Sequence, residues 1–178
     1  MRTLSRGCTV VPLATLVLQA TLSAQGQPLD LDQAVETAEG TVTALYDLVS
    51  SEAGSTPDWG KVRSMFIPEA VVVLRTTRDS TTVFSLDGFI QDFVDFTENA
   101  KTVETGFVER VLRTKAVVMG DMAHVWVLYE AFIPGRDRPP QQGVDSWLVI
   151  WKGGRWWIAA VTNEIPRQGV VVPAELVG

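Results

Sequence analysis

The stretch GGRWWIAAVTNEIP, residues 153–166, decides the fold. Its two glycines are typical of a two-residue hairpin turn, and the apolar run after them predicts a strand. Such a turn pairs Lys152 with Arg155, so residues 143–152 and 155–164 form an antiparallel hairpin. Neighbouring residues of a strand point to opposite faces of a sheet. The two adjacent tryptophans of this strand must therefore be covered from two different sides.

Both faces of this hairpin are apolar. Counted outward from the turn, one face carries Asp145, Trp147, Val149, Trp151, Trp156, Ile158, Ala160 and Thr162, and the other carries Ser146, Leu148, Ile150, Trp157, Ala159, Val161 and Asn163. A sheet with one wet face alternates apolar and polar residues instead. We therefore expect helices on one face and a second copy of the chain on the other, with Trp147, Trp151 and Trp156 at the centre of a homodimer interface. The alternative is a β-bulge that shifts the register, with the N-terminal segment covering the patch.

The rest of the chain reads as helices followed by strands. Apolar residues at helical spacing and capping residues predict helices over 32–51, from 58 to before Pro68, and over 86–100. β-branched and apolar runs predict strands over 70–77, 81–84, 105–119, 122–133, 143–152 and 155–164. This order predicts an α+β fold with an antiparallel sheet.

The N-terminal 24 residues have the pattern of a secretory signal peptide. Two arginines precede the apolar run VVPLATLVLQATL, and small residues that suit cleavage follow it. We expect an exported protein, periplasmic or secreted, with one domain over 25–178 and its core over 33–166. An uncleaved anchor is the alternative, although the run is shorter than the ~20 apolar residues of a membrane span.

Composition limits the partners of this domain. After residue 24 there are 13 basic and 21 acidic residues, a formal charge of −8. Nucleic acids and anionic membranes attract basic surfaces, so neither is an expected partner after signal cleavage. The one cysteine, Cys8, lies in the leader, so no disulfide is expected in the domain.

Three stretches together resemble the nuclear transport factor 2-like superfamily, in its SnoaL-like branch. They are DWGKVRSMFIPEAVV (58–72), GDMAHVWVLYEAF (120–132) and DSWLVIWKGGRWWIAAVTNEIP (145–166). The resemblance covers roughly residues 33–166. It implies a cone-shaped, curved antiparallel sheet wrapped around three N-terminal helices, with an apolar pocket at the wide end. It also points to dimerisation through the sheet, but it names no activity, because this fold serves many functions.

The resemblance also suggests which residues line the pocket. By similarity to the ketosteroid isomerases, the face with Ser146, Trp157 and Asn163 lines it. The candidate pocket residues are Tyr46, Trp59, Phe66, Tyr129, Ser146, Trp157 and Asn163. Tyr46 matches the tyrosine of those isomerases only loosely. Their closing-hairpin aspartate falls on Ser146, while Asp145 is expected on the opposite face. A scytalone dehydratase pattern needs two histidines, and this chain has one.

Few residues are candidates for catalysis. His124 and Glu164 are the candidate general bases, since a carboxylate in an apolar cone can have a raised pKa. A hydrogen-bonded structural histidine is the alternative for His124. Ion pairs with Arg110 or Arg113 are the alternative for the strand carboxylates Glu109, Glu130 and Glu164. No pattern indicates a metal site or a cofactor.

Three functions fit these observations. The first is binding of a small apolar or aromatic molecule without catalysis. The second is a proton-transfer enzyme of the isomerase, dehydratase or cyclase type, with a lone pocket carboxylate or His124 as base. This second function loses its support if His124 and Glu164 lie on the convex face. The third is an interaction module whose pocket is filled by its own Trp157 and Tyr129.

Overall fold

The computed structural model describes residues 29–77 and 79–177 and confirms the α+β class. The predicted signal peptide lies outside these described residues. The elements are α1 Leu31–Ala34, α2 Ala38–Val49, α3 Trp59–Ser64, β1 Phe66–Thr77, β2 Ser80–Ser85, α4 Leu86–Asn99, α5 Thr102–Thr105, β3 Val108–Met119, β4 Met122–Phe132, β5 Gln141–Lys152, β6 Arg155–Glu164 and the 3₁₀ helix η1 Ala174–Leu176.

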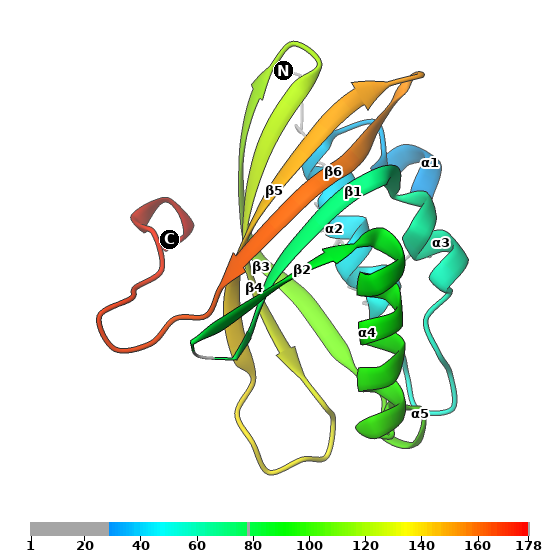
Figure 1. The fold of residues 1–178 in the computed structure, drawn as a ribbon, viewed down its shortest axis with the longest axis vertical. Coiled ribbons are helices and arrows are strands. Elements are labelled where there is room, and N and C mark those ends of the chain that lie inside the picture. Colours follow the sequence, from blue (N-terminus) through cyan, green and yellow to red (C-terminus); the bar gives the residue numbers. More distant parts are fainter. Residues whose placement is uncertain (1–28, 78, 178) are drawn as a thin grey trace, which may run out of the picture.

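The six strands form one curved, unclosed sheet in the order β2-β1-β6-β5-β4-β3 (Figure 1). Four of the five strand pairs are antiparallel, as predicted. Strand β1 runs parallel to β6, so the sheet is mixed and the prediction of a purely antiparallel sheet is wrong at this pair. Hydrophobic alternation encodes which face of a strand is buried, but it does not encode the direction of a neighbour that is distant in sequence.

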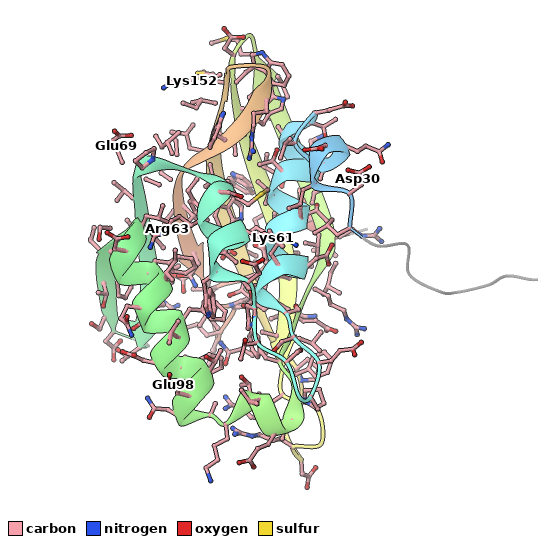
Figure 2. The ribbon with its side chains drawn as sticks, turned by 90° about the vertical axis from the view of Figure 1, so that its right-hand side faces the viewer. Asp30, Lys61, Arg63, Glu69, Glu98 and Lys152 are labelled. Atoms are coloured by element: carbon pink, nitrogen blue, oxygen red, sulfur yellow. The ribbon has the colours of Figure 1, made fainter. Side chains whose placement is uncertain are left out.

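Helices α2, α3 and α4 cover one face of the sheet, and the core lies between these layers (Figure 1). Each helix begins at a side chain that accepts a hydrogen bond from a free N–H group of the first turn: Thr37 for α2, Asp58 for α3 and Ser85 for α4. Seen from the helical side, charged residues such as Lys61 and Glu98 lie on the outer surface of this layer (Figure 2).

Element boundaries differ from the prediction in three places. The expected helix over 32–51 is two helices, with a break at residues 35–37 where Thr37 caps the second one. Strand β1 begins at Phe66, so Pro68 lies inside the strand rather than at the end of the preceding helix. Residues 102–105 form the short helix α5 and not the start of a strand.

A β-bulge in the last hairpin changes the predicted faces. Lys152 pairs with Arg155 as predicted, but the register shifts between Leu148 and Val149, where Ala159 is the extra residue of β6. Beyond the bulge, the residues of β6 exchange faces. Val161 and Asn163 therefore lie on the same face as Trp147 and Asp145, and this face is the one under the helices.

The two adjacent tryptophans are covered from opposite sides. Trp156 is 7% exposed and belongs to the core. Trp157 points outward, where the guanidinium of Arg155 lies 4.1 Å from its ring centre and its indole N–H donates to the carbonyl of Lys152. A cation–π contact within the chain therefore covers the second indole.

The C-terminal segment lies on the side of the sheet away from the helices (Figure 1). Its Leu176 is 1% exposed and shares a pocket with Leu112 and Leu128 of the outer face. Within residues 29–77 and 79–177, no helix is long and apolar enough to span a membrane.

Candidate functional site

A cavity of about 80 Å³ lies between α2, α4 and the covered face of the sheet. Most of its wall is apolar or aromatic, as is usual for small-molecule sites. Its lining residues are Leu45, Tyr46, Val49, Leu74, Phe89, Phe93, Glu109, Tyr129, Asp145, Trp147, Val161 and Asn163. Two carboxyl groups, two phenols and an amide are thus the polar groups of an otherwise apolar chamber.

A wider pocket of about 350 Å³ adjoins this inner cavity. The two share Leu74, Phe89, Phe93, Glu109 and Tyr129, so these residues form the passage between them. The loop between β4 and β5 forms part of the outer wall, and Arg136 fixes this loop by donating to the carbonyl of Ala100 at 2.7 Å. A ligand that enters through the outer pocket therefore meets Glu109 and Tyr129 before it reaches Asp145.

Asp145 is held at the inner end by a chain of donors. The indole N–H of Trp147 donates to the Tyr46 hydroxyl at 3.1 Å, and the Tyr46 hydroxyl donates to Oδ2 of Asp145. The second carboxylate oxygen, Oδ1, is buried and has no hydrogen-bond partner in the described part of the chain. Burial raises the pKa of Asp145 to about 7, and the hydrogen bond from Tyr46 limits the rise.

Glu109 is the second carboxyl group of the cavity. It lies on β3, where no salt bridge or side-chain hydrogen bond to it is present among the described residues. Burial, followed by the nearby charge of Asp145, raises the pKa of Glu109 to about 8. Near neutral pH, Glu109 therefore holds its proton while Asp145 is close to half ionised.

Tyr129 lies across the backbone of the neighbouring strand. It pairs directly with Gly143, and a Cβ atom at that position would lie 2.4 Å from the ring carbon Cζ and from the hydroxyl oxygen. Glycine is thus required there because the phenol occupies the space of a side chain. Burial, followed by the nearby charges of Asp145 and Glu109, raises the pKa of Tyr129 above the ordinary value, and Asn163 lines the same cavity.

The structure brings together three of the seven candidate pocket residues: Tyr46, Tyr129 and Asn163 line the inner cavity. Phe66 is buried beside the cavity, with its ring centroid 6.4 Å from that of Trp147. Trp59 packs on Phe93, with 5.5 Å between the ring centroids. The remaining two, Ser146 and Trp157, lie on the opposite face of the sheet. For Ser146 and Trp157 the predicted choice of the pocket face is wrong, and Asn163 reaches the cavity because the bulge moves it to the face of Asp145.

The two candidate bases also lie outside the cavity. His124 is exposed on the outer face, where its Nε2 is 2.7 Å from Oγ of Ser146. Glu164 forms salt bridges with Arg75 and Arg167, which keep its pKa below the ordinary value together with the hydrogen bond from the N–H of Ile165. Both side chains lie away from the cavity. The ion pairs of Glu164 are with Arg75 and Arg167, and not with Arg110 or Arg113 as the predicted alternative had it.

The predicted centre of the dimer interface is wrong for two of its three tryptophans. Trp147 and Trp156 are 4% and 7% exposed and belong to the core under the helices. Trp151 is partly exposed and packs edge-on against Trp156 at 5.7 Å. The homodimer itself stays a prediction, and any interface on the sheet must use the outer face.

Asp145 and Glu109 were missed as a pair by sequence reasoning. The count from the turn places Asp145 on the face of Trp147 and Trp156, as the structure does, but the prediction took this face as the outer one, whereas the helices cover it. Glu109 was expected to form an ion pair, but Arg110 pairs with Glu130 instead. Within the described ranges, no group of three or more His, Cys, Asp or Glu side chains is placed to hold a metal ion.

Comparison with known proteins identifies the fold. No family model matches the chain, and no curated protein matches its sequence. Among solved structures, an NTF2-like family protein from Streptomyces avermitilis described as a candidate dehydratase shares 16% identity over 76% of this chain and 98% of its own, with a TM-score of 0.56. A candidate aromatic ring hydroxylase from Novosphingobium aromaticivorans shares 14% sequence identity over 71% of this chain and 87% of its own, with a TM-score of 0.53.

A third similar structure, a domain with a cystatin-like fold from Nostoc punctiforme, shares 12% identity over 72% of this chain and 77% of its own, with a TM-score of 0.52. At these identities the likeness shows the fold and no activity. The chain has the nuclear transport factor 2-like fold, as the sequence resemblance implied.

Proposed function

We propose that this chain binds a small apolar or aromatic molecule in the inner cavity and transfers protons on it, with Asp145 as general base and Glu109 as general acid. The observation that carries the proposal is the buried, unpartnered Oδ1 of Asp145 in a cavity that also holds Glu109. A buried acceptor without a partner costs about 1–3 kcal/mol. A buried polar group without a hydrogen-bond partner therefore calls for an explanation, and contact with a ligand is one.

The roles follow from the hydrogen bonds and from the two pKa values. Trp147 donates to the Tyr46 hydroxyl, which donates to Oδ2 of Asp145; this favours the ionised form of Asp145 and leaves Oδ1 as an acceptor with no protein partner among the described residues. The pKa of Glu109 is raised to about 8, so this carboxyl group carries a proton at neutral pH. Two carboxyl groups with different pKa values in one apolar site are typical of acid–base catalysis.

The reaction class is proton removal from carbon and its return at another atom, as in isomerisation or elimination. Asp145 takes the proton, and the electron pair of the broken C–H bond forms a C=C bond in the ligand. In an isomerisation the π electrons of the adjoining double bond shift to its far atom, which takes the proton of Glu109; in an elimination the bond to the leaving group breaks and Glu109 protonates that group. Binding without catalysis is the remaining function of the same cavity if this transfer does not occur. Export and a homodimer are further parts of the proposal, independent of the cavity.

Hydrogen–deuterium exchange tests the proposed chemistry without the natural substrate. Small ketones such as acetophenone are incubated with the protein in D₂O, and loss of the C–H signals next to the carbonyl is followed by proton NMR. We expect exchange above the buffer rate, and a loss of 100-fold or more in Asp145→Asn, within the range that a general base contributes.

Glu164→Gln is the matched control, because this carboxyl lies outside the cavity in salt bridges. It should exchange at the wild-type rate. If wild type, Asp145→Asn and buffer give equal rates for every ketone that binds, then the cavity binds without catalysis.

A further inference from the structure

A further pocket, of about 410 Å³, lies on the outer face of the sheet and is larger than the inner cavity. We call it the strap pocket, because the C-terminal segment forms part of its wall. It shares a single lining residue, Asn163, with the inner cavity, and neither Asp145 nor Glu109 lines it. The proposed acid–base chemistry therefore does not use the strap pocket.

The wall away from the sheet is formed by the C-terminal segment, residues 165–177, which lies on this side of the molecule (Figure 1). Four residues of the segment line the pocket: Pro166, Val170, Val171 and Pro173. Arg167 and Val170 exchange two backbone hydrogen bonds across a turn that contains Gly169, where φ is +82°. Near the other end of the segment, Leu176 is buried against the sheet. The segment is thus held at two points, and the pocket between them has a defined wall.

The floor of the strap pocket is a row of paired residues on three neighbouring strands. Trp126 of β4 pairs with Ser146 of β5, and Ser146 pairs with Thr162 of β6. Trp126 is 37% exposed and lines the pocket, so its indole offers a flat apolar surface there. Aromatic rings bind such a surface by stacking or edge-to-face contact.

The opposite end of the pocket is positively charged. Arg75, on β1, and Arg167, in the C-terminal segment, both form salt bridges with the carboxylate of Glu164. Arg75 and Glu164 line the pocket, and Arg167 joins them through Glu164. Two guanidinium groups and one carboxylate sum to a single positive charge, although the domain as a whole is acidic. Guanidinium groups bind carboxylates with paired, charge-assisted hydrogen bonds.

We propose that the strap pocket binds a small amphipathic carboxylate, with its apolar or aromatic body on Trp126 and its carboxylate at Arg75 and Arg167. Strands β4 and β1 are three positions apart in the sheet. Neighbouring strands lie about 4.8 Å apart, so the two ends of the site are separated by about 14 Å between backbones. With the side chains at both ends allowed for, this span suits a molecule of the size of a naphthoate.

The strap pocket and the inner cavity should prefer opposite charges. An anion in the inner cavity would lie beside the two carboxyl groups of Asp145 and Glu109, which disfavours it. An anion in the strap pocket meets the excess positive charge of the arginine cluster. The charge of a bound probe therefore reports which of the two sites it occupies.

Isothermal titration calorimetry with 2-naphthoate and with 2-naphthamide, its neutral analogue of the same shape, tests the proposal. We expect wild type to bind the naphthoate roughly tenfold more tightly, as for one charge-assisted hydrogen bond. This preference should shrink when salt is added, because the arginine side chains are partly exposed. Arg167→Gln should reduce the preference and leave the affinity for the naphthamide unchanged.

A matched pair of tryptophan variants locates the bound ring. Trp126→Ala should weaken the binding of both probes roughly fivefold, as for one lost aromatic contact. Trp157→Ala is the control, because this indole lies on the outer face but does not line the strap pocket. It should bind both probes as wild type does.

Three results would overturn the inference. The first is equal or tighter binding of the naphthamide, which would place the probe in the inner cavity. The second is naphthoate binding that Trp126→Ala leaves unchanged. The third is a wild type that binds neither probe, and a dimer that becomes a monomer in Trp126→Ala would then show a second copy of the chain on this face. None of these results bears on the proton transfer proposed for Asp145 and Glu109, which is tested separately by deuterium exchange.

Discussion

The hydroxyl of Tyr46, on helix α2, donates a hydrogen bond to the carboxylate of Asp145, on strand β5. The two residues are 99 positions apart in the sequence, so this bond ties the helical layer to the sheet at the inner end of the cavity. The second oxygen of Asp145 is buried and has no hydrogen-bond partner among the described residues. Much of the proposed chemistry depends on this one contact.

Tyr46→Phe should raise the pKa of Asp145 further, because the hydrogen bond that stabilises the carboxylate is lost while burial remains. The indole N–H of Trp147 also loses its acceptor. We expect a loss of about 1–3 kcal/mol in the free energy of unfolding. Urea denaturation measures the stability. The account of this contact fails if stability is unchanged.

Stability should fall as the pH rises through neutrality. Asp145 and Glu109 have raised pKa values in the folded protein, about 7 and about 8. Between the ordinary carboxyl range and these values, the unfolded chain binds fewer protons than the native one, so raising the pH favours unfolding. The free energy of unfolding should fall by on the order of a few kcal/mol between about pH 5 and about pH 8.

The double variant with Asp145→Asn and Glu109→Gln tests whether these two groups cause the fall of stability with pH. Its melting temperature should be nearly independent of pH over the same window, because the neutral amides do not titrate. An equal slope in wild type and in the double variant would assign the effect to other groups.

Gly143→Ala should displace the ring of Tyr129. The added Cβ atom would lie 2.4 Å from ring and hydroxyl atoms, a distance that requires a shift of the tyrosine. Overpacking of this kind costs typically about 1–3 kcal/mol. Gly88→Ala is the control, since its Cβ would meet side-chain atoms at 3.5 Å or more and alanine favours a helix. Thermal unfolding of both variants measures the difference.

The predicted homodimer can be tested on the outer face alone. Leu148 is 42% exposed there, next to the partly exposed Trp126. If two copies associate through this face, Leu148→Glu should shift the native mass spectrum from dimer to monomer without a change of fold. Trp156→Ala should instead lower stability by about 3–5 kcal/mol, because Trp156 is a core residue. A monomeric wild type would end the dimer prediction.

The sequence predicted the helix–strand order, because capping residues and hydrophobic periodicity are local signals. Asp58 and Ser85 each start a helix where such signals place it, whereas the cap at Thr37 divides a stretch that was predicted as one helix. The pairing of Lys152 with Arg155 was also predictable from the turn. The faces beyond the bulge were not, since one extra residue at Ala159 exchanges them and no local pattern announces it.

The candidate site was predictable only in part for the same reason. Tyr46 and Tyr129 were expected in the cavity from the resemblance, and they lie there. The positions of the carboxyl groups depend on long-range geometry. Arg110 pairs with Glu130 and not with Glu109, and the helices cover the face of the sheet that carries Asp145. Such choices arise from packing between segments that are distant in sequence.

The most direct test of the account is a carboxyl titration by carbon-13 NMR, with aspartate and glutamate labelled at the side-chain carboxyl carbon. We predict two resonances that titrate at about 7 and about 8, one lost in Asp145→Asn and the other in Glu109→Gln. Because the two groups interact, each substitution should also shift the remaining titration. If every carboxyl group titrates below about 5, in the ordinary range, the buried acid–base pair does not exist and the proposed function is wrong.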